Sequence, residues 1–103
     1  MTLSAGGMHV LALKIELRLT ACRSLKDKRA VLRPIIDGIR NRFTVAVAET
    51  DRQDEWQRAT IGLAAISNSP GHASEMIDEA ERFVWSFPEV EVLETWQRWL
   101  EED

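Results

Sequence analysis

The sequence predicts one α+β domain, in which a four-stranded antiparallel sheet carries two helices on one face and the elements follow the order βαββαβ. Two observations favour this class: some segments alternate apolar and polar residues, whereas two longer segments repeat apolar residues every three or four positions. A third is size, because 103 residues suffice for one hydrophobic core but hardly for two.

Residues 9–19 form the clearest predicted strand. Every second residue from Leu11 to Leu19 is apolar, which indicates a strand with one buried face. A helix follows, with Ser24 as its N-cap and Asp27 in the capping-box position. Its apolar stripe runs from Leu25 to residue 43 and continues on both sides of Pro34, which predicts one helix bent at the proline.

Two strands and a hairpin are expected next. Residues 43–49 alternate again, residues 50–55 are polar and predict a hairpin loop, and residues 56–67 form a third strand. Gly62 in the middle of that strand indicates a bulge or a close approach of another chain segment.

The second helix is expected to begin after Ser69 as N-cap, with Pro70 in the first turn, and to stop at Pro88. Residues 89–93 predict a short last strand, and residues 95–103 are rich in Trp and Glu without a clear pattern. We expect a flexible tail at residues 1–7 and a single domain at 8–103. With right-handed crossovers, this order of elements is that of the ferredoxin-like fold.

The composition excludes several classes of protein. Cys22 is the only cysteine, so it forms no internal disulfide and no multi-cysteine metal site. No segment has the roughly 20 consecutive apolar residues that a membrane-spanning helix requires. Residues 1–7 lack the basic and apolar regions of a signal peptide, so the expected location is the cytoplasm, without a membrane partner.

The charges are divided between the two halves of the chain. Residues 1–52 hold 10 Lys and Arg against 5 Asp and Glu, a net +5, whereas residues 53–103 hold 3 against 12, a net −9. Such a division favours an anionic partner for the first half. It equally suits self-association, with the basic half of one molecule on the acidic half of another.

One flank of the first predicted helix is basic. At 100° per residue, Lys26, Arg29, Arg33 and Arg40 fall within about 60° of one another. Such a row suits a phosphate backbone or an acidic protein surface. The candidate RNA- or partner-binding residues are Arg23, Lys26, Lys28, Arg29, Arg33 and Arg40. The alternative is a solvated helix face with local ion pairs to Asp27 and Asp37.

The sheet face opposite the helices is expected to meet a partner, because its predicted residues are mostly small and uncharged. Its central strands hold no aromatic residue, which argues against reading single-stranded RNA by base stacking on the sheet. We therefore expect a homo-oligomer, most simply a dimer. The candidate interface residues are Ala12, Ala46, Ala48, Thr60, Ala64, Trp96 and Trp99.

Residue patterns typical of catalysis are missing from the sequence. It shows no Ser-His-Asp order, no paired inward carboxylates and no zinc signature, so we expect a protein without enzymatic activity, cofactor or metal. Asp51, Asp54 and Glu55 crowd the predicted hairpin and could hold a cation, although acids in a turn are usually just solvated. A preference for DNA cannot be read from the sequence.

Residues 8–92 resemble the YlxP-like family, domain of unknown function 503. The resemblance rests on Met8-His9-Val10, the run from Ser24 to Arg29, Arg42-Phe43 with Val45 and Ala48-Glu49, and Gln57-Arg58-Ala59. It implies a bacterial protein with a ferredoxin-like fold, encoded beside factors of transcription elongation, translation initiation and ribosome maturation. It implies no established activity and no catalytic residues. The resulting hypothesis is docking on rRNA or a ribosomal subunit; the alternative is a homo-oligomeric regulatory module with an acidic protein partner.

Overall fold

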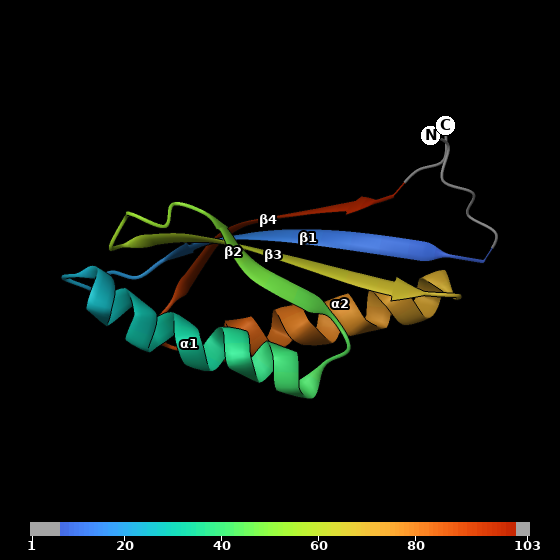
Figure 1. The fold of residues 1–103 in the computed structure, drawn as a ribbon, viewed down its shortest axis with the longest axis horizontal. Helices are drawn as coiled ribbons and strands as arrows, with labels where there is room; N and C mark the ends of the chain where they lie inside the picture. Colours follow the sequence, from blue (N-terminus) through green and yellow to red (C-terminus); the bar gives the residue numbers. More distant parts are fainter. Residues whose placement is uncertain (1–6, 101–103) are drawn as a thin grey trace.

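The computed structural model describes residues 7–100 and contains six elements. Along the chain these are β1 (His9–Arg18), α1 (Leu25–Arg42), β2 (Ala46–Asp51), β3 (Arg58–Ser67), α2 (Pro70–Trp85) and β4 (Glu91–Trp99). The strands form one sheet in the order β2-β3-β1-β4, with every neighbouring pair antiparallel. Both helices lie on the same side of this sheet (Figure 1). The predicted α+β, ferredoxin-like βαββαβ fold is confirmed.

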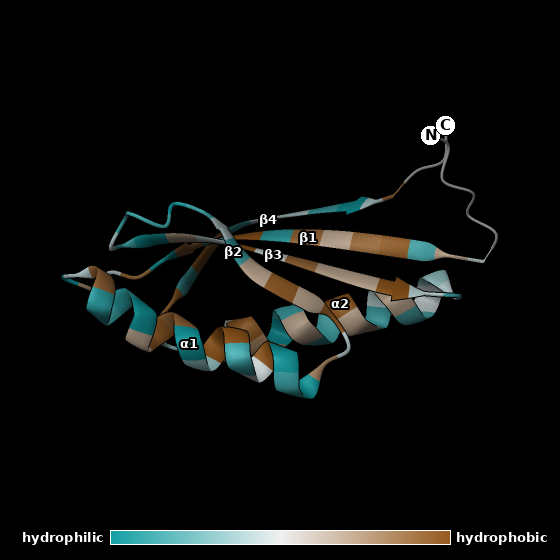
Figure 2. Ribbon diagram, viewed as in Figure 1, coloured by the Kyte–Doolittle hydropathy of each residue, from teal (hydrophilic) through white to brown (hydrophobic). Residues whose placement is uncertain are grey.

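The core lies between the sheet and the two helices. Alternate residues of β1, from Leu11 to Leu17, are buried, and they face Ile35 and Ile39 of α1 and Ile77 of α2 within one apolar cluster. Figure 2 shows hydrophobic residues along β1 and β3 and hydrophilic residues on the outer side of α1. Because each fully buried Leu or Ile stabilises the fold by about 1.5–3 kcal/mol, this layer is the main source of stability.

Both helices begin at the predicted caps. Ser24 Oγ accepts a hydrogen bond from Asp27 N (3.0 Å), and the Asp27 carboxylate accepts one from Arg23 N (2.9 Å). In α2, Ser69 is the N-cap and Pro70 occupies the first turn, where its missing N–H costs nothing. Helix α1 runs from Leu25 to Arg42 with Pro34 inside it, so the prediction of one helix rather than two is correct.

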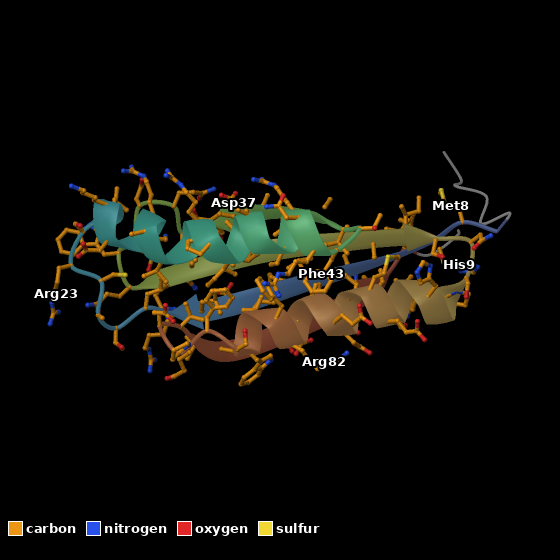
Figure 3. All side chains as sticks on the ribbon, turned by 90° about the horizontal axis from the view of Figure 1, so that it is seen from below. Met8, His9, Arg23, Asp37, Phe43 and Arg82 are labelled. Atoms are coloured by element: carbon orange, nitrogen blue, oxygen red, sulfur yellow. The ribbon has the colours of Figure 1, made fainter. Side chains whose placement is uncertain are left out.

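The two helices approach closely at Gly38 of α1. A Cβ atom built on Gly38 would lie 2.5 Å from Cζ of Phe83 in α2, so only glycine leaves room for the ring. Phe83 makes edge-on contacts with Phe43 and Phe87, and the Arg42 guanidinium lies 4.9 Å from its ring centre. Phe43 lies in the region between the helices (Figure 3).

Several strand boundaries differ from the prediction. β2 begins at Ala46 rather than at residue 43, and β3 begins at Arg58, leaving Trp56 exposed in the hairpin loop. β4 continues to Trp99. Residues 95–99, for which the sequence showed no clear pattern, therefore belong to a strand, and the prediction for them was wrong. Leu93 is an extra residue at a bulge in the β1–β4 pairing, which shifts the alternation of side chains. Residues 101–103, and all of the predicted tail except Gly7, lie outside the described residues.

Candidate functional site

The basic flank of α1 faces solvent. Lys26, Arg29, Arg33 and Arg40 are all exposed, as is Arg23 just before the helix. Figure 3 shows the nitrogen-tipped side chains along the outer side of α1, away from α2. Lys26, Arg29 and Arg33 form no ion pair with any residue between 7 and 100, and the contact of Arg40 with Asp37 is long at 3.8 Å. Local pairing therefore leaves most of this charge uncompensated.

A groove separates α1 from the edge strand β2 and the hairpin that follows it. Its volume is about 500 Å³. Leu25, Leu32 and Ile36 line it together with Arg29, Arg33 and Arg40 from the basic flank. Lys28 and the acids Asp37, Glu49 and Asp54 line it as well. Arg40 also donates a hydrogen bond to the carbonyl of Val47 (3.3 Å), which occupies a backbone acceptor of the edge strand. Three of the exposed candidate cations thus lie around a concave surface of mixed charge.

Lys28 lies at the base of the groove and, unlike the other candidate cations, is buried. Its side chain is 3% exposed, and its ammonium donates hydrogen bonds to the carbonyls of Arg52 (2.7 Å) and Glu55 (2.8 Å). It also lies 2.8 Å from Glu49 Oε2, a close ion pair without good hydrogen-bond geometry. Two of the three donors of the ammonium are bound to carbonyls and its charge is paired with Glu49, so this buried group is not presented to a partner. Lys28 instead holds the β2–β3 hairpin against α1.

The hairpin loop is fixed by further polar contacts. Arg52 adopts a left-handed backbone conformation, with φ at 61°, and its N–H donates to Asp51 Oδ1. Its guanidinium binds Glu16 at 3.0 Å and Glu55 at 3.1 Å, and hydrogen bonds to Glu55 and Glu16 raise the pKa of Arg52 above its usual value. The wall of the groove is therefore a constrained loop.

The open face of the sheet contains four of the predicted interface alanines. Ala46 and Ala64 lie opposite each other on β2 and β3, Ala64 pairs with Ala12, and Ala48 pairs with Gly62. A hollow of about 380 Å³ lies over these residues. Trp96 borders it from β4 and is 46% exposed.

Gly62 explains the shape of this hollow. The β2–β3 register shifts between Glu49 and Asp51, so Thr50 is bulged. A Cβ atom on Gly62 would lie 2.8 Å from Cγ2 of Thr50. A close approach at Gly62 is therefore present, made by the side chain of Thr50, whereas the bulge lies at Thr50 of β2 and not at Gly62 itself.

Two predicted interface residues are not available to a partner. Thr60 is 2% exposed, and its hydroxyl donates to Glu16 Oε1 (2.8 Å) beneath the arginines that bind the same carboxylate. Trp99 pairs with Leu11, so it faces the helix side of the sheet and packs against the core. Trp96 and Trp99 are three residues apart, and an odd separation in a strand places side chains on opposite faces.

Neither a membrane span nor a metal site is found within residues 7–100. No helix in this range is long and apolar enough to cross a bilayer. The same range contains no group of three or more His, Cys, Asp or Glu side chains arranged to hold a metal ion. Of the hairpin acids considered above, Asp51 accepts from Arg52 N and Glu55 pairs with the Arg52 guanidinium.

Comparison with known proteins identifies the family. The family model described as protein of unknown function (DUF503) matches residues 10–97. The chain belongs to the DUF503 family. One curated relative, the uncharacterized protein YlxP of Bacillus subtilis (strain 168), is 41% identical over 77 residues, covering 75% of this chain and 84% of the relative. The resemblance found in the sequence is therefore confirmed for this DUF503 protein.

Similar solved structures support the fold of the DUF503 protein and nothing beyond it. The de novo designed protein Foldit4 matches with a TM-score of 0.52 and 11% identity, over 93% of this chain and 99% of the design. A designed protein with a ferredoxin fold, LFR1 1, matches with a TM-score of 0.51 and 9% identity, over 86% and 84% of the two chains.

Sequence reasoning missed the role of Lys28 in this DUF503 protein, although a signal was present. At 100° per residue, Lys28 falls between Ile35 and Ile39 on the helical wheel, inside the apolar stripe. The polar cluster of Glu16, Arg52 and Arg58 was also missed, because it joins residues from three separate segments. Only the strand register brings them together.

Proposed function

We propose that this DUF503 protein is an RNA-binding factor that docks on structured RNA, such as that of a ribosomal subunit, through the cations of α1. The observation that carries the proposal is the row of exposed, largely unpaired cations Lys26, Arg29, Arg33 and Arg40 on one helix flank. Cations in a row neutralise successive phosphates and release their counterions, which supplies most sequence-independent affinity for nucleic acid.

The groove beside α1 supports the proposal. Arg29, Arg33 and Arg40 line it from the helix side, so a phosphate backbone lying along α1 contacts guanidinium groups that bind phosphate with two donors. The outward positions of β1 and β3 hold no aromatic ring, so base stacking on the sheet is not expected. The expected mode is recognition of backbone and shape rather than of single-stranded sequence.

The opposite charge of α2 favours one orientation on RNA. Glu75, Asp78 and Glu79 are exposed on α2, whereas the exposed acid of α1 beyond its first turn is Asp37. A polyanion therefore attracts the α1 side of the helix layer and repels the α2 side. This dipolar surface orients the protein as it approaches the RNA.

Binding of a fluorescein-labelled RNA hairpin, followed by fluorescence anisotropy, tests the proposal with two matched variants. Arg33→Glu and Arg82→Glu are the same substitution at exposed helical positions, the first on the basic flank of α1 and the second on α2. We expect Arg33→Glu to weaken binding about tenfold or more and to lower the salt slope by about one. Arg82→Glu should leave the affinity unchanged or slightly lower.

Three results would contradict the proposal. The first is that the wild-type protein does not bind the RNA hairpin at low salt. The second is that Arg33→Glu and Arg82→Glu change the RNA affinity equally. The third is capture of a defined acidic protein that survives nuclease treatment and depends on Arg33, with no RNA bound. That result would assign the basic flank to a protein partner instead.

A further inference from the structure

The open face of the sheet has the features of a surface that is covered in the working molecule. Ile66 and Trp96 are 59% and 46% exposed, and Ala46 and Ala48 are exposed on the same face of the sheet. The residues that point outward from a solvated sheet face are normally polar. Contiguous exposed apolar residues instead mark interaction sites. Glu16, Arg52 and Arg58 bind one another at the other end of this face, whereas Lys14 and Arg98 lie beside the Trp96 ring.

We propose that a second copy of this chain covers the face, in a dimer whose two sheets pack against each other. The strand register supports a self-complementary contact. Ala48, Gly62, Lys14 and Trp96 form one row across β2, β3, β1 and β4, with the alanine at one edge and the tryptophan at the other. A two-fold axis parallel to the strands, midway between the two sheets and level with the boundary between β3 and β1, places each Trp96 over Ala48 of the other copy.

The shapes suit this exchange. The hollow of about 380 Å³ extends over Ala46, Ala48 and Gly62, where side chains are small or missing, and Trp96 stands at its opposite border. Sheets that pack face to face lie about 10 Å apart, which leaves room for an indole only over such small residues. The projecting ring of one copy thus meets the hollow of the other.

Two cations accompany Trp96 on this face. Arg98 lies two residues after Trp96 on β4, in the same row as Ala46, and Lys14 lies beside Trp96 on β1. Lys14 and Arg98 flank the Trp96 ring at 5.9 and 5.2 Å, which holds the indole upright on the face.

The area available is sufficient for a reversible dimer. Four strands about 4.8 Å apart and about ten residues long, at about 3.3 Å per residue, give the face about 600 Å². Two such faces in contact bury about 1,200 Å², which is the lower limit for specific protein–protein interfaces. We therefore expect association that depends on concentration, with a dissociation constant on the order of micromolar.

Sedimentation equilibrium of the purified chain tests the dimer with matched glutamate variants. Ala48→Glu places a carboxylate in the hollow, whereas Ala21→Glu makes the same change at an exposed alanine in the loop before α1. Both positions are exposed in the single chain, so both variants should fold, as circular dichroism can verify. We expect Ala48→Glu to weaken the dimer at least tenfold and Ala21→Glu to leave it unchanged.

A wild-type chain that stays at 11.8 kDa at high micromolar concentration would overturn the proposal. A dimer insensitive to Ala48→Glu would overturn it equally. RNA is not needed for this experiment, so its outcome is independent of the function proposed above.

Discussion

Lys28 combines the position of a core residue with the charge of a surface residue. Its aliphatic stem lies in the apolar stripe of α1, and its ammonium is held by two carbonyls and the carboxylate of Glu49. Removing one partner of a buried ion pair leaves the other without compensation, which costs more than the pair contributes. Lys28 therefore stabilises the fold by fixing the hairpin at residues 52–55 to the helix.

Lys28→Met, which keeps the length of the stem and removes the charge, should lower the free energy of unfolding by about 3 kcal/mol. Urea denaturation measures the change. Lys26→Met, two residues earlier and exposed, is the matched control and should change stability by less than about 0.5 kcal/mol. Adding Glu49→Gln to Lys28→Met should recover part of the loss. Equal stabilities of the two methionine variants would show that the ammonium of Lys28 has no structural role.

Cys22 is the second residue whose burial determines its chemistry. It is 2% exposed, and burial, followed by the nearby charge of Asp27, raises the pKa of its thiol above the usual 9.0. The folded state thus retains the proton longer than the unfolded state does. Any contribution of this group to stability is complete below pH 9.0 and is lost as the pH rises above it.

We expect a thiol reagent to label Cys22 much more slowly in the folded protein than in urea, because the thiolate is both scarce and covered. In addition, the free energy of unfolding of the wild type should fall above pH 9.0 more steeply than that of Cys22→Ala. Rapid labelling of the folded protein at neutral pH would contradict this account.

At the scale of elements, Gly38 sets the distance between α1 and α2. The ring of Phe83 fills the space that a side chain on residue 38 would need, and it is itself packed between Phe43 and Phe87. Close packing of the two helices thus depends on a glycine within α1, despite the unfavourable helix propensity of glycine.

Gly38→Ala should destabilise the protein by about 1–3 kcal/mol, because the methyl group forces the Phe83 ring out of its position. Gly71→Ala is the control: in the first turn of α2, a Cβ atom there meets only Ser69 Oγ at 3.8 Å. It should be neutral or stabilise by up to about 1 kcal/mol, since alanine restricts the unfolded chain. Thermal unfolding separates the two, and a Gly38→Ala variant as stable as Gly71→Ala would contradict the packing described.

Local patterns predicted most of the elements because their causes are local. The alternation from Leu11 to Leu17 and the caps at Ser24 and Ser69 involve neighbours in sequence. The end of the chain was mispredicted because β4 is an edge strand, and the bulge at Leu93 interrupts its alternation. The site was predicted in part: the cations of α1 are exposed, whereas Lys28 and Thr60 are satisfied by partners distant in sequence.

At the scale of the whole molecule, the two proposed surfaces lie on opposite sides of the sheet. The α1 flank belongs to the helix layer, and the row from Ala48 to Trp96 belongs to the open face (Figure 1). A dimer joined at the open faces therefore carries its two α1 helices on its outer sides. Two linked binding surfaces bind a long RNA more tightly than either alone, if the RNA can reach both.

The central claim is that this DUF503 protein binds RNA through phosphate contacts made by α1. The dependence of RNA affinity on salt measures those contacts most directly. With about four phosphates neutralised, the logarithm of the association constant should fall against the logarithm of salt concentration with a slope of about −3, between about 50 and 200 mM salt. The triple variant Lys26→Glu, Arg29→Glu, Arg33→Glu should reduce this slope to about −1 or abolish binding. A wild-type slope near zero, or a slope that the triple variant leaves unchanged, would contradict the claim.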